Sequence, residues 1–207
     1  MHPNPVYRGM PKETNQAYAR ERGFGVLSTN GDFGPLLAHV PFLLSDDGQY
    51  ADLHLVRSNA IVRAISAPVP AVIAVLGPDS YISPDWYEAS DMVPTWNYVA
   101  VHLRGTLRRL EQDELPDLLD RLSAHFEQQL APKPIWTSAK MSEDVLERML
   151  RQIVPFRLDI TQTEGTWKLA QNKPDSVRMA ASRQVKARGI GQECAVLSAL
   201  MMAPNGE

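Results

Sequence analysis

The sequence predicts a mainly β (α+β) fold, in which a single small β-barrel carries a few peripheral helices. Apolar and polar residues alternate over stretches of strand length; Val99, Val101 and Leu103, for example, would share one face of a strand. Turn signals that contain glycine, such as Asn30-Gly31, separate these stretches. Roughly five to seven strands joined by hairpins, with helical periodicity confined to short segments around them, predict a barrel with helices outside.

The first half of the chain predicts a polar helix followed by a β-meander. Residues 12–22 favour a helix that stops at Gly23. Turn signals then separate three apolar runs, which are residues 24–29, 35–44 and 49–56. Ser58 is expected to cap a short helix that ends before Pro68. The β-branched run at residues 70–77 predicts a buried strand.

The second half predicts two more strands and several helices. Residues 77–96, which are rich in aromatic side chains, are expected to form a loop. An apolar stripe that ends at Phe126 indicates an amphipathic helix, and Ser142 is expected to cap a second one. The expected strands are residues 97–110 and 153–165, and the expected helices are residues 112–130, 142–150 and most of the tail from Pro174. We expect one domain, residues 1–207, with residues 175–207 as its helical C-terminal extension.

Composition narrows the class of protein. The chain has 207 residues and a net charge of −3, so its overall charge gives no drive toward nucleic acid phosphates. The single cysteine, Cys194, excludes an internal disulfide and a zinc cluster of several cysteines. No apolar run has the length of a membrane span, and the N-terminus lacks the apolar core of a secretion signal. We therefore expect a cytoplasmic protein without membrane partners.

The segment HLVRSN, residues 54–59, is a candidate phosphate site. A strand is expected to end here and a helix to begin, and helix N-termini present free N–H groups. Arg57 adds a guanidinium that can bind phosphate through two parallel hydrogen bonds. A capped helix beside a solvated arginine is the alternative.

Three histidines fall in expected strands, at His39, His54 and His102. Three histidines can bind a metal, but none of them forms a close-spaced pair of the HxH or HxxxH kind. A contact to a ligand, or a histidine bonded inside the barrel, is the favoured interpretation, and we expect no metal.

Two aromatic segments have both a structural and a functional interpretation. The side chains of residues 77–98 could cover the core or a dimer interface, or could stack on a planar ligand. Trp167 and Lys168 precede Gln171 and Asn172, whose amides could bond the edge of a heterocycle or cap a helix. The basic residues Arg178, Arg183, Lys186 and Arg188 are expected to form a solvated helix face. Direct DNA binding has no support in the sequence, and no catalytic motif is present.

Four segments resemble one family in combination. These are AHVPFLL, HLVRSNA, SYISPDWY with VPTWNYVAVHLRGTLR, and KLAQNK, spread over residues 5–178. Together they resemble the PaiB-type FMN-binding negative transcriptional regulators. The resemblance implies a split β-barrel of the pyridoxine-phosphate-oxidase-like kind, and a homodimer that binds FMN at the interface between its subunits. Ala170 departs from the family pattern, which has serine there.

The resemblance also implies cofactor-binding roles. Arg57, Ser58 and Asn59 would hold the FMN phosphate, with His54 beside the ribityl chain. Tyr81 and Ser83 would add hydroxyls, while Trp96, Asn97 and Tyr98 would border the cofactor. The last implied group is Trp167, Lys168, Gln171 and Asn172, with His39 and His102 as weaker candidates.

Two classes of function stay open at this point. The first is an FMN-binding regulator that reduces expression of its target genes, by direct or indirect means. The second is an FMN-dependent oxidoreductase of a small molecule, in which the flavin carries the electrons and His102 or Tyr98 moves a proton. A haem-handling split-barrel protein is a third alternative, with His39 or His54 as the ligand candidate.

Overall fold

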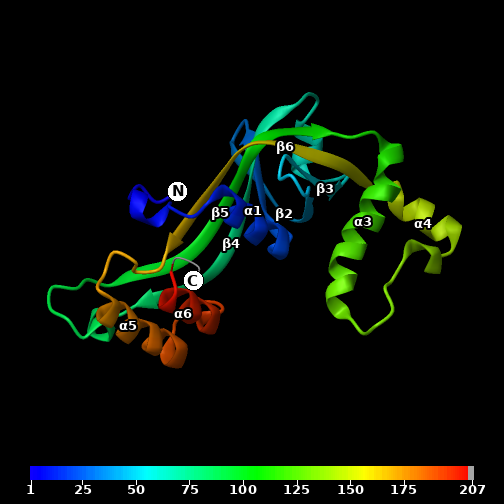
Figure 1. Ribbon diagram of the computed structural model, residues 1–207. Helices are drawn as coiled ribbons and strands as arrows, with labels where there is room; N and C mark the ends of the chain where they lie inside the picture. The colour runs from blue at the N-terminus through cyan, green and yellow to red at the C-terminus, as the bar shows by residue number, and fades with distance from the viewer. Residues whose placement is uncertain (205–207) are drawn as a thin grey trace. The chain divides into compact units, whose positions relative to one another are not determined.

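Six strands form a closed barrel in the computed structural model, which describes residues 1–204 (Figure 1). Their order around the barrel is β1-β2-β3-β6-β5-β4. The strands are β1 (Phe24–Gly31), β2 (Gly34–Leu44), β3 (Tyr50–Val56), β4 (Val69–Ile82), β5 (Thr95–Arg109) and β6 (Ile153–Lys168). The predicted fold class and range of strand number are therefore confirmed.

Helices connect and flank the strands. The α-helices are α1 (Lys12–Arg22), α2 (Ala60–Ala64), α3 (Leu115–Glu127), α4 (Glu143–Leu150), α5 (Asp175–Arg188) and α6 (Cys194–Met202). Short 3₁₀ turns are η1 (Pro5–Tyr7), η2 (Pro84–Tyr87), η3 (Gln112–Glu114), η4 (Gln128–Leu130) and η5 (Ser138–Lys140). None of the helices among residues 1–204 is both long and apolar enough to cross a membrane.

The chain divides into two compact units. Unit 1 comprises Met1–Asn15, Val75–His102 and the chain from Glu164 onward. Unit 2 comprises Gln16–Ala74 and Leu103–Thr163. The long strands β4, β5 and β6 contribute residues to both units. The single-domain organisation expected from the sequence stays a prediction.

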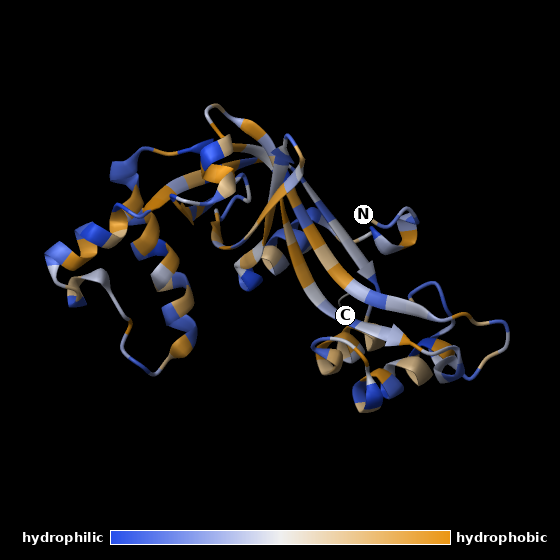
Figure 2. Cartoon of the chain, turned by 180° about the vertical axis from the view of Figure 1, so that it is seen from behind, coloured by the Kyte–Doolittle hydropathy of each residue, from blue (hydrophilic) through white to orange (hydrophobic). Residues whose placement is uncertain are grey.

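Unit 2 contains the predicted β-meander. β1 pairs with β2 from Phe24↔Pro41 to Gly31↔Gly34, and β2 pairs with β3 through Phe42↔Leu53. Alternate side chains, such as Leu27, Phe42 and Leu53, are fully buried. Figure 2 shows an alternation of orange and blue-to-white segments along the long strands of the barrel. One face of each strand thus forms the core, as the period of two predicts.

The turn between β2 and β3 requires glycine. Gly48 has φ +67°, and a Cβ there would lie 2.1 Å from Nε2 of Gln16. That amide nitrogen donates to the Gly48 carbonyl at 3.1 Å. Glycine therefore allows both the left-handed turn and the close approach of α1.

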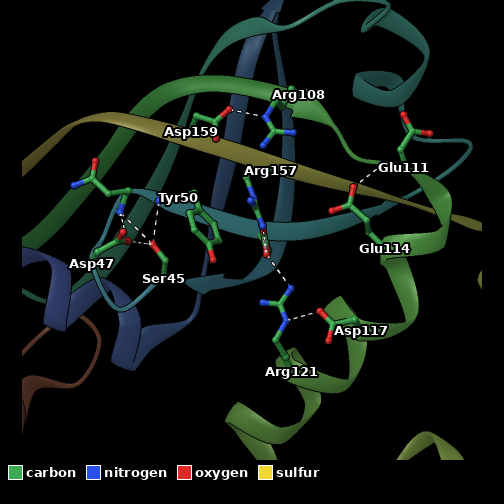
Figure 3. A network of polar contacts seen from close by, with 12 residues as sticks. Ser45, Asp47, Tyr50, Arg108, Glu111, Glu114, Asp117, Arg121, Arg157 and Asp159 are labelled. Atoms are coloured by element: carbon green, nitrogen blue, oxygen red, sulfur yellow. Dashed lines mark hydrogen bonds and ion pairs between the residues drawn. The ribbon is translucent and has the colours of Figure 1, made fainter.

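A buried carboxylate fixes α3 to the sheet of unit 2. Asp52 on β3 is fully buried and accepts hydrogen bonds from Nε and Nη2 of Arg157 at 2.6 and 2.9 Å. Nη2 of Arg121, on α3, also donates to Asp52 at 3.1 Å, while its Nε bonds Asp117 (Figure 3). The Arg157 guanidinium lies 3.7 Å from the centre of the Tyr50 ring. The charge on Asp52 is therefore paired, as a buried carboxylate requires.

In unit 1, helices α5 and α6 pack side by side (Figure 1). Their contact includes the buried hydroxyls of Ser182 and Ser198, which lie 3.0 Å apart. Ser182 also donates to the Ser198 carbonyl, and Ser198 to the Ser182 carbonyl, each at 2.9 Å. Small residues allow this close approach. The predicted helical tail with a break near Gly189 and Gly191 is confirmed as far as residue 204, and residues 205–207 of the expected extension lie outside the described part of the chain.

The predicted cap of the short helix was wrong by one residue. α2 begins at Ala60, and its N-cap is Asn59, whose Oδ1 accepts from the Ile61 N–H at 2.9 Å. Ser58 lies one position before this cap. An asparagine side chain caps at least as well as serine, so both residues satisfied the pattern.

The predicted aromatic loop at residues 77–96 was too long. β4 continues to Ile82 and so includes Tyr81, while Trp96 already lies in β5. Pro78 lies within this extension of β4, although proline cannot donate a hydrogen bond to a neighbouring strand. The β1–β4 register, however, ends at Ala74, so the missing N–H of Pro78 removes no bond to β1.

Candidate functional site

The predicted site residues fall into two groups, one in each compact unit. His54, Arg57, Ser58 and Asn59 belong to unit 2. Tyr81, Ser83, Trp96, Asn97, Tyr98, Trp167, Lys168, Gln171 and Asn172 belong to unit 1.

The unit 2 group lies where β3 ends and α2 begins. Arg57 is exposed and donates from Nε to the Arg151 carbonyl at 3.0 Å. Its Nη2 donates to Oε1 of Gln112 at 3.2 Å and to the Ile153 carbonyl at 3.5 Å. These contacts attach Arg57 to the start of β6, and they leave Nη1 without a hydrogen bond to residues 1–204. No pattern in the sequence indicated Gln112 as a partner of Arg57.

The neighbours of Arg57 leave further donors available. The Ser58 side chain is exposed and makes no hydrogen bond within the described part of the chain. Asn59 uses its oxygen as the cap of α2, which leaves its amide NH₂ as a donor. A guanidinium, a hydroxyl and an amide therefore follow one another at the end of β3. This set of donors suits a phosphate.

His54 has an unsatisfied nitrogen. It lies in β3 opposite Pro155 of β6 and is partly buried. Its Nδ1 is buried and has no hydrogen-bond partner within residues 1–204. Burial lowers the pKa of this imidazole below its ordinary value, so the neutral form is favoured. A buried polar atom without a partner is costly, and the hydroxyl of a bound ligand would satisfy it.

The unit 1 group is centred on Tyr81 and Trp96. Their rings meet edge to face on the neighbouring strands β4 and β5, with centroids 6.4 Å apart. Trp96 is 46% exposed, a large fraction for an indole in a strand. Nζ of Lys168 donates to Oγ1 of Thr95, the residue before Trp96. Burial lowers the pKa of the Lys168 amine. An exposed ring and a half-buried amine thus occur close together in this unit.

Three other predicted residues bond to their own unit. Asn97 is buried and donates to the sulfur of Met201 at 3.6 Å. Nε1 of buried Trp167 donates to Asn15 at 2.8 Å. Gln171 accepts from the Leu169 N–H and donates to the Trp167 carbonyl and to that of Val6. These side chains organise unit 1, and their contact with a cofactor stays a prediction.

The remaining predicted residues are less constrained. Ser83 occupies the N-cap of η2 without a side-chain bond, Tyr98 is half-buried on β5, and Asn172 is exposed. Ala170, where the family pattern has serine, adopts φ +60°. A tight turn at Ala170 therefore follows β6, and the Lys173 N–H donates back to its carbonyl at 2.9 Å.

One expectation about charge was wrong. Arg183, Lys186 and Arg188 are exposed on α5, as expected, but Arg178 is buried. Its guanidinium donates to the Met201 carbonyl and to Asp175. The sequence could not reveal this burial because α6, which supplies the carbonyl, follows after a break. No group of three His, Cys, Asp or Glu residues positioned for a metal is found within residues 1–204.

The six-stranded barrel with its flanking helices belongs to the split-barrel class of folds, which includes flavin-binding proteins. Residues 1–162 match the family described as "Putative FMN-binding domain". The chain belongs to this family, and FMN is the cofactor that the membership assigns. The protein is 32% identical over 171 residues to the protease synthase and sporulation protein PAI 2 of Bacillus subtilis. That alignment covers 82% of this chain and 81% of the relative, and it confirms the PaiB-type resemblance.

Solved structures confirm the fold. The FAD and heme binding protein of Mycobacterium smegmatis superposes with a TM-score of 0.59 at 17% identity, over 89% of this chain and 82% of that one. The flavocytochrome Anf3 of Azotobacter vinelandii gives a TM-score of 0.53 at 13% identity, over 81% and 72% of the two chains. At this level of identity the likeness is one of fold.

Proposed function

We propose that this protein is an FMN-binding homodimer of the PaiB type, with flavin bound where two copies meet, and that it acts in the cytoplasm as a negative regulator of transcription. Its membership of the FMN-binding family supports the flavin. The relative in B. subtilis carries a name that refers to protease synthesis and sporulation, which is consistent with a regulatory role.

The observation that carries the dimer is an apolar outer face on β1 and β2, here called the β1–β2 face. Phe24 and Leu37 are 53% and 61% exposed, on the side opposite the barrel core. Val26 and Pro41 lie partly exposed on the same side, next to the exposed side chain of His39. The outer face of a solvated antiparallel sheet is normally polar. Exposed apolar side chains in one patch are typical of a protein interface.

The donors at the end of β3 support a phosphate site in unit 2. Arg57 would contribute the free edge of its guanidinium, and Ser58 and Asn59 a hydroxyl and an amide. The unsatisfied Nδ1 of His54 would accept a hydrogen bond from a ribityl hydroxyl. When bound, FMN supplies redox chemistry through its ring. In unit 1, the exposed Trp96 and the Lys168 amine are the groups we propose to border it.

The regulatory output is proposed to be indirect. The chain carries a net charge of −3, and the acidic balance opposes association with DNA phosphates. A change in a metabolite or in a partner protein would transmit the effect instead. An FMN-dependent oxidoreductase is the competing outcome, and the experiment below separates the two.

The test begins with the absorption spectrum of the protein as purified. We expect a flavin spectrum, release of FMN on denaturation as identified by mass, and twice the chain mass in light scattering. Steady reduction and reoxidation of the flavin in the presence of one of a panel of substrates would favour the oxidoreductase function over the regulatory one. A monomer without bound flavin, under conditions where FMN is supplied in excess, would overturn the proposal.

A further inference from the structure

Two adjoining hollows in unit 1 form one cleft beside the N-terminus of α5, here called the α5 cleft. The first has a volume of about 180 Å³ and is lined by Tyr7, Met10 and Trp167, among others. The second has about 470 Å³ and is lined by Asp175, Arg178 and Met202, among others. Val6, Gln171 and Pro204 line both, so the two hollows adjoin. The cleft thus has an aromatic end and a charged end.

Arg178 supplies the charge. Its side chain is only 9% exposed. Nε donates to the Met201 carbonyl at 2.7 Å, and Nη1 donates to Oδ1 of Asp175 at 2.6 Å. Nη2 has no hydrogen bond to the described residues. A buried guanidinium needs acceptors for all its donors, so this arrangement leaves capacity for one more acceptor group.

Asp175 is a replaceable partner. Its side chain is 86% exposed, and such ion pairs contribute little to stability. An incoming anion would therefore meet the Arg178 guanidinium, with Asp175 as the single carboxylate among the lining residues.

The other end of the cleft favours an apolar body. The rings of Tyr7 and Trp167 are buried, and Met10 and Pro11 extend the apolar wall. Burial raises the pKa of the Tyr7 phenol, so the ring stays uncharged near neutral pH. Clefts that combine apolar walls with one charged anchor are typical sites for small molecules.

We infer that the α5 cleft binds a small carboxylic acid with an aromatic or apolar body, whose carboxylate pairs with Arg178. The guanidinium fork matches a carboxylate in shape and charge. The cleft lies wholly within unit 1 of a single chain, so the inference does not rest on the proposed dimer or on bound flavin. Trp167 and Gln171 line it, while their polar atoms bond to the protein itself.

The first test compares matched ligands by calorimetry on the full-length protein as purified. Phenylacetate and hexanoate are the probes, and phenylacetamide is the neutral match of the first. We expect phenylacetate to bind at least about tenfold more tightly than phenylacetamide, since a charged acceptor strengthens the bonds from Arg178. Equal affinity for the acid and the amide, or no binding of either acid at millimolar concentration, would overturn the inference.

The second test changes the charged end in opposite directions. Asp175→Asn removes the competing carboxylate and keeps Arg178, so phenylacetate should bind roughly threefold more tightly. Arg178→Gln should weaken it at least about tenfold. Arg183→Gln, an exposed residue on the same helix, is the control and should change nothing. If Arg178→Gln does not fold, the direction of the Asp175→Asn effect decides, and unchanged or weaker binding there contradicts the assignment.

Discussion

Arg57 would combine a structural role and a phosphate-binding role in one guanidinium. Nε and Nη2 hold the start of β6 through the carbonyls of Arg151 and Ile153 and the side chain of Gln112. The proposed phosphate would meet the remaining edge. A side chain fixed by the protein loses less conformational entropy when a ligand binds, so the structural contacts would favour affinity.

Arg57→Ala should weaken FMN binding at least about tenfold, or about 1.4 kcal/mol, because the only cation of this donor group is lost. A flavin titration measured by fluorescence quenching gives the affinity. Gln112→Ala is the control, since it removes a partner of Arg57 and leaves the guanidinium in place. Unchanged affinity in Arg57→Ala would exclude Arg57 from the site, and an equal loss in Gln112→Ala would assign the effect to the geometry of the β6 corner.

His54 should make stability depend on pH. Burial lowers the pKa of His54 in the folded protein, whereas in the unfolded chain it lies near about 6.5. Below that value the unfolded state binds a proton that the folded state resists, so stability is fully present above about pH 6.5 and falls as the pH falls below it. His54→Gln should reduce this loss, as measured by urea unfolding of the flavin-free protein at about pH 7.5 and about pH 5.

A parallel decline in His54→Gln and the parent would show that the buried Nδ1 of His54 does not resist protonation.

At the scale of elements, the Asp52 network links α3 to β3 and β6 through Arg121 and Arg157. Its two arginines are not equivalent. Arg157 makes two hydrogen bonds to Asp52 and is 22% exposed, whereas Arg121 makes one and is 40% exposed. Loss of the less exposed partner leaves the Asp52 charge with far less compensation.

Arg157→Met should therefore lower the free energy of unfolding by about 3 kcal/mol. Arg121→Met should lower it by no more than about 1 kcal/mol, because Arg157 still pairs with the carboxylate. Urea denaturation at neutral pH measures both. Equal losses in the two variants would contradict the view that Arg157 is the main partner of Asp52.

Sequence periodicity predicted most of the helices and strands, but it did not predict where they end. The alternation at Val99, Val101 and Leu103 predicted a strand, and these residues are buried in β5. Leu115, Leu118 and Leu122 predicted the buried face of α3 in the same way. The extent of β4 beyond Gly77 depends on its neighbours in the sheet, which local patterns do not contain.

Most side-chain contacts in the candidate site could not be predicted from the sequence. The motif around VPTWNY identified Trp96, but the bond between Lys168 and Thr95 joins residues far apart in the chain. The burial of Arg178 depends on the Met201 carbonyl in another helix. The structural role of Asp52 was likewise missed, because it depends on Arg157 and Arg121, which are far from Asp52 in the sequence.

At the scale of the whole molecule, the central question is what covers the β1–β2 face. In unit 2 the core faces of these strands bury Leu27, Val40 and Phe42. Their outer faces expose Leu37 and Phe24, which would cost free energy in water. We propose a second copy as the occupant, because it would also complete the proposed flavin site, so dimer formation and flavin binding should depend on the same surface.

Leu37→Glu should therefore separate the dimer and release the flavin together, because a charge buried in an apolar interface without a partner is strongly unfavourable. Light scattering on the size-exclusion column gives the mass, and the absorption spectrum of each peak gives the bound flavin. Met149→Glu is the matched control, since Met149 is 52% exposed on α4, away from the β1–β2 face in sequence and element. It should stay dimeric and retain the flavin. A Leu37→Glu protein that keeps both its mass and its flavin would show that the second copy does not cover this face, and one that becomes a monomer with FMN still bound would show that the flavin site is complete within one chain.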